Sequence, residues 1–218
     1  SGGATLNLLN EIVKDSGKKD FRGLKILVLH SGGDSKRVPQ YSACGKLFSP
    51  VPRVLSDGRR STIFDEFMIG FCGVANRIND GAVFCSGDVV LLFNPLQIDF
   101  YARGAAAFSI KENVETGKNH GVYLADKDGN VGMFLHKLSV EKLKELEAVD
   151  NSNNVNIDTG AMVFDSNILN DLYSLVDTPE KLSSLVNEHV RLSLYADFSY
   201  PLATSSTLEG FYQEIPEG

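Results

Sequence analysis

The sequence predicts an α/β fold in which a mixed, mostly parallel sheet is flanked by helices. Two short apolar runs, residues 24–30 (LKILVLH) and 82–86, lack polar alternation and are typical of strands that are covered on both faces. Between them, residues 62–78 carry apolar side chains at helical spacing. Strand, helix and strand in this order form a βαβ unit, which is the building block of Rossmann-like folds.

Each of these first elements has a local signal. Residues 31–52 hold three glycines and three prolines, so neither a helix nor a strand is easily sustained and a long loop is expected after the first strand. Thr62 and Asp65 are spaced as a capping box at the start of the predicted helix.

The rest of the chain alternates between strands and helices. Strands are expected at residues 104–110, 121–125, 131–135 and 160–164, and helices after Ser139, at 167–176 and at 179–194. Asp and Gly in residues 126–130 favour a tight hairpin turn, and the rest of a calcium-loop pattern is missing there. Residues 151–158 are polar and are predicted to be a loop.

Composition narrows the class of protein. The 218 residues are 43% hydrophobic and no linker or repeat divides them, which predicts one domain over residues 1–218. The net charge of −7 argues against a nucleic-acid partner, and no apolar stretch predicts a membrane helix or a signal peptide. Cys44, Cys72 and Cys85 fit neither a disulfide framework nor a zinc site, which favours a reducing, cytoplasmic setting.

The loop after the first strand carries the clearest chemistry. Gly32 and Gly33 allow a sharp turn whose N–H groups can approach a phosphate, while Arg37 and Lys46 supply positive charge. Neither the G-x-G-x-x-G pattern of dinucleotide-binding proteins nor the Walker A pattern is present. Each piece alone suits an ordinary surface loop, but the glycine pair, Arg37 and Lys46 together favour a phosphate-binding loop.

The same loop resembles that of a known family. The string LHSGGDSKRVPQYSACGKLFSPV is similar to the signature loop of sugar nucleotidyltransferases. It matches the fucose-1-phosphate guanylyltransferase family almost residue for residue, including the guanylyltransferase half of bifunctional fucokinase enzymes. The resemblance implies a GT-A-like nucleotidyltransferase fold in which Arg37 and Lys46 are catalytic. It also implies that the nucleotide is bound by Gly32, Gly33, Asp34, Ser35, Arg37 and Lys46.

Two later segments resemble the sugar site of that family. Residues 134–138 (FLHKL) and 156–164 (NIDTGAMVF) are similar to a Glu-Lys-Pro motif and to an N-x-x-T-G motif ahead of a strand. The match implies that Lys137 is a catalytic residue at the sugar phosphate. It further implies that the sugar is faced by Asp158, Thr159 and Gly160. The chain departs from the first motif at His136 and Leu138, where the family has Glu and Pro.

Two aspartates are candidate metal ligands. Asp88 follows the second buried strand, at the edge where ligands gather in open α/β sheets, although this position suits a turn or helix cap equally well. The resemblance implies that Asp88 holds Mg²⁺ against the substrate phosphates, and a loose likeness adds Asp197 as a second ligand.

The expected reaction is therefore Mg²⁺-dependent transfer of GMP from GTP to L-fucose-1-phosphate, which gives GDP-fucose and pyrophosphate. One alternative keeps this chemistry with another substrate pair, such as UTP and an N-acetylhexosamine-1-phosphate. A second alternative is a non-catalytic regulatory domain that binds a nucleotide sugar. The glycine-rich opening of the chain resembles the interior of a family segment, so we expect a fragment of a longer protein that can carry a fucokinase domain.

Overall fold

The computed structural model describes residues 2–31, 39–43, 45–87, 89–100 and 103–214. They form two compact units. Unit 1 comprises Ser1–Ser16, Ala107–Thr159 and Leu172–Gly218, and unit 2 comprises Gly17–Ala106 and Gly160–Asp171. Strands β5 and β8 each contribute one part to each unit.

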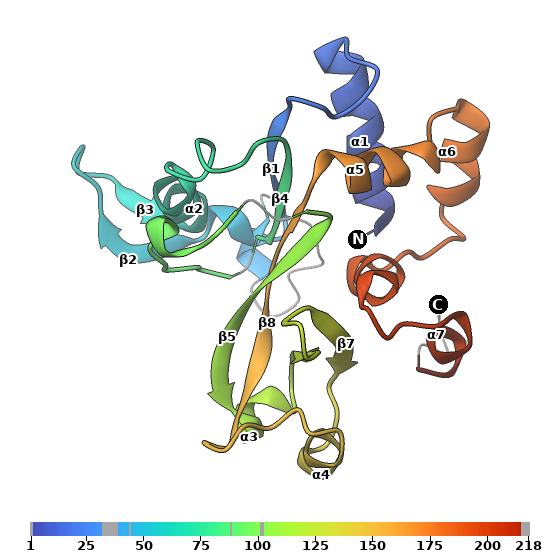
Figure 1. Cartoon of the computed structure of the whole chain (residues 1–218). Helices are drawn as coiled ribbons and strands as arrows, with labels where there is room; N and C mark the ends of the chain where they lie inside the picture. The colour runs from blue at the N-terminus through green and yellow to red at the C-terminus, as the bar shows by residue number, and fades with distance from the viewer. Residues whose placement is uncertain (1, 32–38, 44, 88, 101–102, 215–218) are drawn as a thin grey trace. The chain divides into compact units, whose positions relative to one another are not determined.

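The elements alternate between strands and helices over much of the chain (Figure 1). The loop predicted over residues 31–52 is corrected at its end, because β2 begins at Pro50 and pairs with β3 as an antiparallel hairpin that was not predicted. The strands are β1 (Lys25–His30), β2 (Pro50–Val54), β3 (Arg60–Thr62), β4 (Gly81–Ser86), β5 (Ala105–Asn113), β6 (Gly121–Ala125), β7 (Val131–His136) and β8 (Asn154–Phe164). The α-helices are α1 (Gly2–Ser16), α2 (Ile63–Phe71), α3 (Val114–Gly117), α4 (Val140–Glu145), α5 (Ser166–Ser174), α6 (Pro179–Leu185) and α7 (Leu208–Glu214). Short helical turns are η1 (Pro39–Tyr41), η2 (Lys46–Phe48), η3 (Pro95–Gln97), η4 (Leu194–Ser199) and η5 (Tyr200–Leu202).

The sheet of unit 2 is centred on β4. This strand pairs in parallel with β1 and antiparallel with the C-terminal part of β8. It is buried almost throughout, and Phe84 packs on Phe164 of β8 with ring centroids 5.2 Å apart. Strand β1 is less covered than the sequence predicts, because Leu27 is 37% exposed beside an open apolar cavity of about 300 Å³ that Met68 and Phe71 of α2 also line.

Helix α2 begins where the capping box predicts. The Thr62 side chain accepts a hydrogen bond from the Asp65 N–H, and the Asp65 carboxylate accepts one from the Thr62 N–H. The helix ends at Phe71 instead of continuing to residue 78, and turns follow it. Val74 and Ile78 are buried nonetheless, so the apolar spacing beyond Phe71 indicated burial rather than continued helix.

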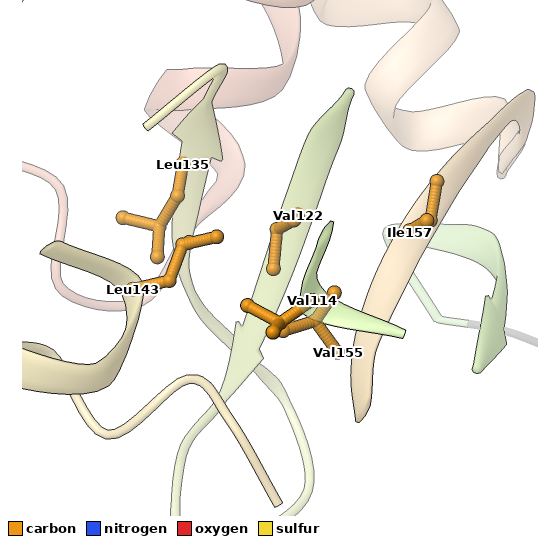
Figure 2. Close-up of a cluster of buried hydrophobic side chains, with 6 residues drawn as sticks. All are labelled: Val114, Val122, Leu135, Leu143, Val155 and Ile157. Atoms are coloured by element: carbon orange, nitrogen blue, oxygen red, sulfur yellow. The ribbon is translucent and has the colours of Figure 1, made fainter. Parts of the chain in front are cut away.

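The sheet of unit 1 is antiparallel. Strands β6 and β7 form the predicted hairpin, and the Asp126 carboxylate accepts hydrogen bonds from the N–H groups of Asp128 and Asn130 in its turn. Strand β6 pairs on its other side with β8. One face of this sheet packs on α3 and α4 through six buried side chains, which Figure 2 shows: Val114, Val122, Leu135, Leu143, Val155 and Ile157.

Strand β8 corrects the prediction of a loop over residues 151–158, since it begins at Asn154. Val155 and Ile157 point into the core, while Asn154, Asn156 and Asp158 alternate with them and are only partly buried. This is the period of two of a strand with one apolar face. The polar residues of this segment have the composition of a loop, so composition does not distinguish a loop from a strand here. The pairing with β6 makes the segment a strand.

The helices of unit 1 share a second cluster. Leu6 of α1, Val176 after α5 and Phe198 of η4 are buried together, and the Asn10 side chain donates to the Val176 carbonyl at 3.0 Å. Helix α1 was not predicted from the glycine-rich opening. Helix α6 ends at Leu185, well before residue 194, while α4 begins after Ser139 as expected.

The prediction of a mixed α/β fold flanked by helices is confirmed. The expectation that the sheet is mostly parallel is not met among the described pairings. Strand β1 pairs in parallel with β4, but β8 runs antiparallel to both β4 and β6, and β6 with β7 and β2 with β3 form antiparallel pairs. The assignment of residues 1–218 to one nucleotidyltransferase domain stays a prediction. Over the described ranges, no helix is both long and apolar enough to cross a bilayer.

Candidate functional site

In unit 2, the ends of β1 and β4 converge at one edge of the sheet. The Gly87 N–H donates to the His30 carbonyl at 2.9 Å, so the chain leaves both strands at the same place. A Cβ on Gly87 would lie 2.5 Å from the His30 oxygen, and one on Gly45 would lie 2.7 Å from the Ser31 oxygen. These glycines therefore permit backbone contacts that any side chain would prevent.

This edge is where the sequence places the phosphate loop and the first metal ligand. Ser31 leads into the loop, and Gly87 directly precedes the candidate metal ligand. The predicted residues Gly32, Gly33, Asp34, Ser35, Arg37 and Asp88 lie outside the described residues, so their roles stay predictions.

Lys46 is the described member of the predicted nucleotide site. It opens the turn η2 and is partly buried. The next residue, Leu47, is only 5% exposed, and the carbonyl of Ser49 accepts a hydrogen bond from the Ile63 N–H at 3.1 Å. The lysine thus stands on a segment that is anchored to the start of α2.

In unit 1, His136 and Asp158 belong to one row across the sheet, and Lys137 directly follows this row. Gly121 of β6 pairs with His136 at the end of β7, and Val122 pairs with Ile157 of β8. Continuing this register places Asp158 opposite Gly121, so His136 and Asp158 flank the glycine on the same face. Lys137 follows at the end of β7.

Tyr123 is a residue of this face that sequence reasoning missed. Its hydroxyl donates to the Asp158 Oδ1 at 2.9 Å, and its ring packs on Phe134 with centroids 5.2 Å apart. Tyr123 is only 7% exposed, so the Asp158 carboxylate is held by a hydrogen bond from a buried side chain. Residues 35 positions apart carry no local signal of this contact, because it depends on the pairing of β6 with β8.

Burial and neighbouring charges both shift the pKa of His136, which lies at one end of this row. The pKa of His136 is lowered, mainly by burial and then by the neighbouring Lys137 charge, while Asp158 acts in the opposite direction. The neutral imidazole is therefore favoured at neutral pH. Its neighbour in the chain, Lys137, has a φ of 51° and donates its backbone N–H to the His120 carbonyl at 3.0 Å.

A positive φ is uncommon for lysine and marks a backbone held by its surroundings. At Lys137 it turns the chain sharply at the end of β7, and the side chain remains exposed. The observed geometry is compatible with a lysine presented to a ligand.

The two other predicted sugar contacts have structural roles in view. The Thr159 hydroxyl donates to the Phe108 carbonyl of β5 at 2.8 Å. Gly160 has a φ of 72°, where the chain passes from unit 1 to unit 2. Contact of either residue with a sugar stays a prediction.

The second predicted metal ligand is engaged locally. Asp197 Oδ2 accepts a hydrogen bond from the Ser193 N–H at 2.6 Å and so caps the turn η4. Within the described ranges, no three His, Cys, Asp or Glu side chains gather as a metal site. Burial raises the pKa of the Cys85 thiol to about 12, which suits a structural cysteine.

Comparisons with known proteins agree with the resemblance seen in the sequence. A family model described as the fucose pyrophosphorylase domain matches residues 18–217. The chain is 28% identical over 187 residues to a bifunctional fucokinase/GDP-fucose pyrophosphorylase of Arabidopsis thaliana, which covers 79% of this chain and 18% of the relative. It is 26% identical over 238 residues to a fucose-1-phosphate guanylyltransferase of Homo sapiens, which covers 96% of this chain and 38% of the relative.

A fucose-1-phosphate guanylyltransferase of Mus musculus is 28% identical over 161 residues, covering 68% of this chain and 27% of the relative. The chain therefore spans less than two fifths of the length of each of these curated relatives.

Proposed function

The chain belongs to the fucose pyrophosphorylase family, and on that premise we propose that it transfers GMP from GTP to L-fucose-1-phosphate, releasing pyrophosphate. The observation that carries the proposal is the family match over residues 18–217, which includes every predicted site residue. Two relatives are named fucose-1-phosphate guanylyltransferase, and the name of the third joins a fucokinase to a GDP-fucose pyrophosphorylase. A fused fucokinase domain and a cytoplasmic location are parts of the same proposal.

The chemistry requires two polyanions to be held in line. An oxygen of the sugar phosphate attacks the α-phosphorus of GTP, and the bond from that phosphorus to the bridging oxygen of pyrophosphate breaks. Because the nucleophile is already an anion, no general base and no covalent intermediate are needed. The protein contributes positioning and charge stabilisation.

The residues divide this work between the two phosphate groups. The glycine-rich loop and Arg37 bind the triphosphate, and the planar guanidinium suits the departing pyrophosphate because it binds two oxygens at once. Lys46 acts as a point charge near the α-phosphate. Lys137 does the same for the sugar phosphate, and Asp158, held by Tyr123, accepts a hydrogen bond from a sugar hydroxyl.

Mg²⁺ is the proposed cofactor, and Asp88 is its proposed protein ligand. A single carboxylate together with substrate phosphate oxygens is a usual Mg²⁺ environment, so the chain need not supply a full cage. Gly87, which precedes Asp88, lies at the shared edge of β1 and β4, where the phosphate loop begins. Asp197 fits less well, because its carboxylate already caps η4. When bound, the ion supplies neutralisation of charge on the phosphates.

Pyrophosphate release tests the proposal directly. The protein is incubated with Mg²⁺, fucose-1-phosphate and GTP, UTP or ATP in turn, and we expect product only with GTP. Turnover with UTP and an N-acetylhexosamine-1-phosphate instead would replace the substrates but keep the chemistry. Nucleotide-sugar binding without turnover of any pair would indicate a regulatory domain and reject the enzyme.

The metal assignment is tested with Asp88→Asn in the same assay across a Mg²⁺ titration. Asn keeps the size of the side chain and can still cap a turn, so a purely structural aspartate predicts no change. A metal ligand predicts a higher Mg²⁺ requirement and a lower rate even at saturating Mg²⁺.

A further inference from the structure

A buried carboxylate joins α2 to both strands of the β2–β3 hairpin. Glu66 lies in the first turn of α2 and is only 8% exposed. Its Oε1 accepts a hydrogen bond from the Ser61 hydroxyl of β3, and its Oε2 accepts one from Arg53 Nη1 of β2 at 2.7 Å. Ser61 is fully buried, whereas the Arg53 side chain is half exposed.

Burying the Glu66 carboxylate costs free energy, so a contribution to the stability of the fold does not explain its presence well. A buried carboxylate loses its hydration, and an apolar side chain of similar size often stabilises a fold as well or better. The carboxylate adds a fixed geometry, because one oxygen bonds Ser61 of β3 and the other bonds Arg53 of β2. Glu66 therefore sets the position of the hairpin against α2.

Strand β3 runs directly into α2, because its last residue, Thr62, is also the N-cap of the helix, whereas β2 has no such covalent link to α2. A two-stranded ribbon alone is marginally stable in water. Strand β2 is mostly exposed along its length, and Val54 is 67% exposed. The described side-chain links from the hairpin to α2 are the buried bond of Ser61 to Glu66, the ion pair of Arg53 with Glu66, and the bonds of Thr62 and Arg59 to Asp65. Of these, the Glu66 ion pair is the one that reaches β2.

The position of the hairpin fixes the segment that carries Lys46. Turn η2 is separated from β2 by Ser49 alone, and the Ser49 carbonyl accepts from the Ile63 N–H at the start of α2. The rings of Phe48 and Phe64 pack with centroids 5.7 Å apart. Helix α2 therefore contacts the Lys46 segment at two places. It packs directly on η2 through Phe48 and Phe64, and it bonds β2 through Glu66 and Arg53.

We propose that Glu66 is a positioning residue for Lys46, which it acts on through Arg53, Ser61 and the β2–β3 hairpin. The proposal rests on the proposed function of Lys46 in nucleotide binding. Removing the carboxylate loosens the hairpin and shifts the lysine relative to the triphosphate. A misplacement of about 1 Å at such a group can cost on the order of a hundredfold in rate.

The test combines Glu66→Gln with Lys46→Ala in a double-mutant cycle. Glu66→Gln keeps the side-chain size and removes the charge. We expect it to lower kcat/KM for GTP by at least about tenfold, with the KM for fucose-1-phosphate unchanged. In the Lys46→Ala background the same change should have little further effect, because residues that act as a unit are not additive. An equal loss in both backgrounds would overturn the proposal.

A readout without turnover separates this proposal from the proposed function. Hydrogen exchange of the backbone amides of residues 45–54 should be faster in Glu66→Gln than in the wild type. Unchanged exchange there would overturn the positioning role even if the protein is an active guanylyltransferase. Faster exchange in a protein that releases no pyrophosphate would instead reject the proposed function and leave the mechanical link intact.

Two further variants cover loss of folding and general loss of stability. If Glu66→Gln does not fold, Ser61→Ala removes one of the two partners with a smaller change and should show the same non-additivity with Lys46→Ala. Leu169→Ala opens a cavity at a fully buried position of α5 in the same unit, so it should lower the unfolding temperature without removing a bond of the hairpin. It should leave kcat/KM for GTP within about twofold of the wild type. A tenfold loss in Leu169→Ala would show that any destabilisation of unit 2 suffices, and would overturn a specific role for Glu66.

Discussion

Replacement of Lys137 by glycine separates a binding lysine from a structural one. The residue has a φ of 51°, a conformation that costs a non-glycine residue roughly 1–2 kcal/mol. Glycine removes this cost but adds chain entropy to the unfolded state, which costs about 0.5–1 kcal/mol. The backbone hydrogen bond to His120 is retained. We therefore expect Lys137→Gly to raise the free energy of unfolding by between about 0 and 1.5 kcal/mol.

The effect on turnover should be much larger. If the ammonium group contacts the sugar phosphate as the reaction proceeds, its loss should cost about 2–4 kcal/mol in the transition state, or roughly 30- to 1,000-fold in kcat/KM for fucose-1-phosphate. Pyrophosphate release measures this loss, and urea unfolding measures stability on the same preparations.

Glu147→Gly is the matched control. Glu147 also has a positive φ, 58°, and is exposed in unit 1, but it lies outside the row formed by His136, Gly121 and Asp158. Its replacement should affect stability as Lys137→Gly does and leave turnover unchanged. Turnover of Lys137→Gly within twofold of the wild type would refute the phosphate contact, and a stability loss of several kcal/mol would refute the backbone reasoning.

Three further outcomes are expected. Tyr123→Phe removes the hydrogen bond that holds Asp158, so the KM for fucose-1-phosphate should rise several-fold while kcat changes little; an unchanged KM would place the sugar elsewhere. Leu143→Ala opens a cavity in the fully buried cluster of unit 1 and should lower the free energy of unfolding by about 2–5 kcal/mol in urea titrations, and a loss below 1 kcal/mol would contradict this packing. Burial lowers the pKa of His30, so the folded state binds fewer protons than the unfolded state, and the free energy of unfolding should fall as pH drops from about 7 to about 5. His30→Phe should flatten this pH dependence. An identical slope of the free energy of unfolding against pH in the variant would exclude His30 as its source.

The local signals in the sequence were sufficient for several elements. The capping box of Thr62 and Asp65, the buried strand at residues 82–86 and the tight turn after β6 all depend on neighbours within a few positions. The family resemblance was equally local, since it came from residues 24–52. These features determined the α/β class and the family before any long-range contact was known.

Tertiary structure decided the features that depend on distant pairing. Residues 154–158 read as a loop because their polar half resembles one, and β8 exists there because β6 lies beside it. The contact of Tyr123 with Asp158 and the buried link of Glu66 to Ser61 and Arg53 likewise join separate elements. The sequence by itself determined which residue types are available for phosphate and sugar chemistry, and the strand register determined which of them share a face, because side chains meet across a sheet according to pairing rather than sequence distance.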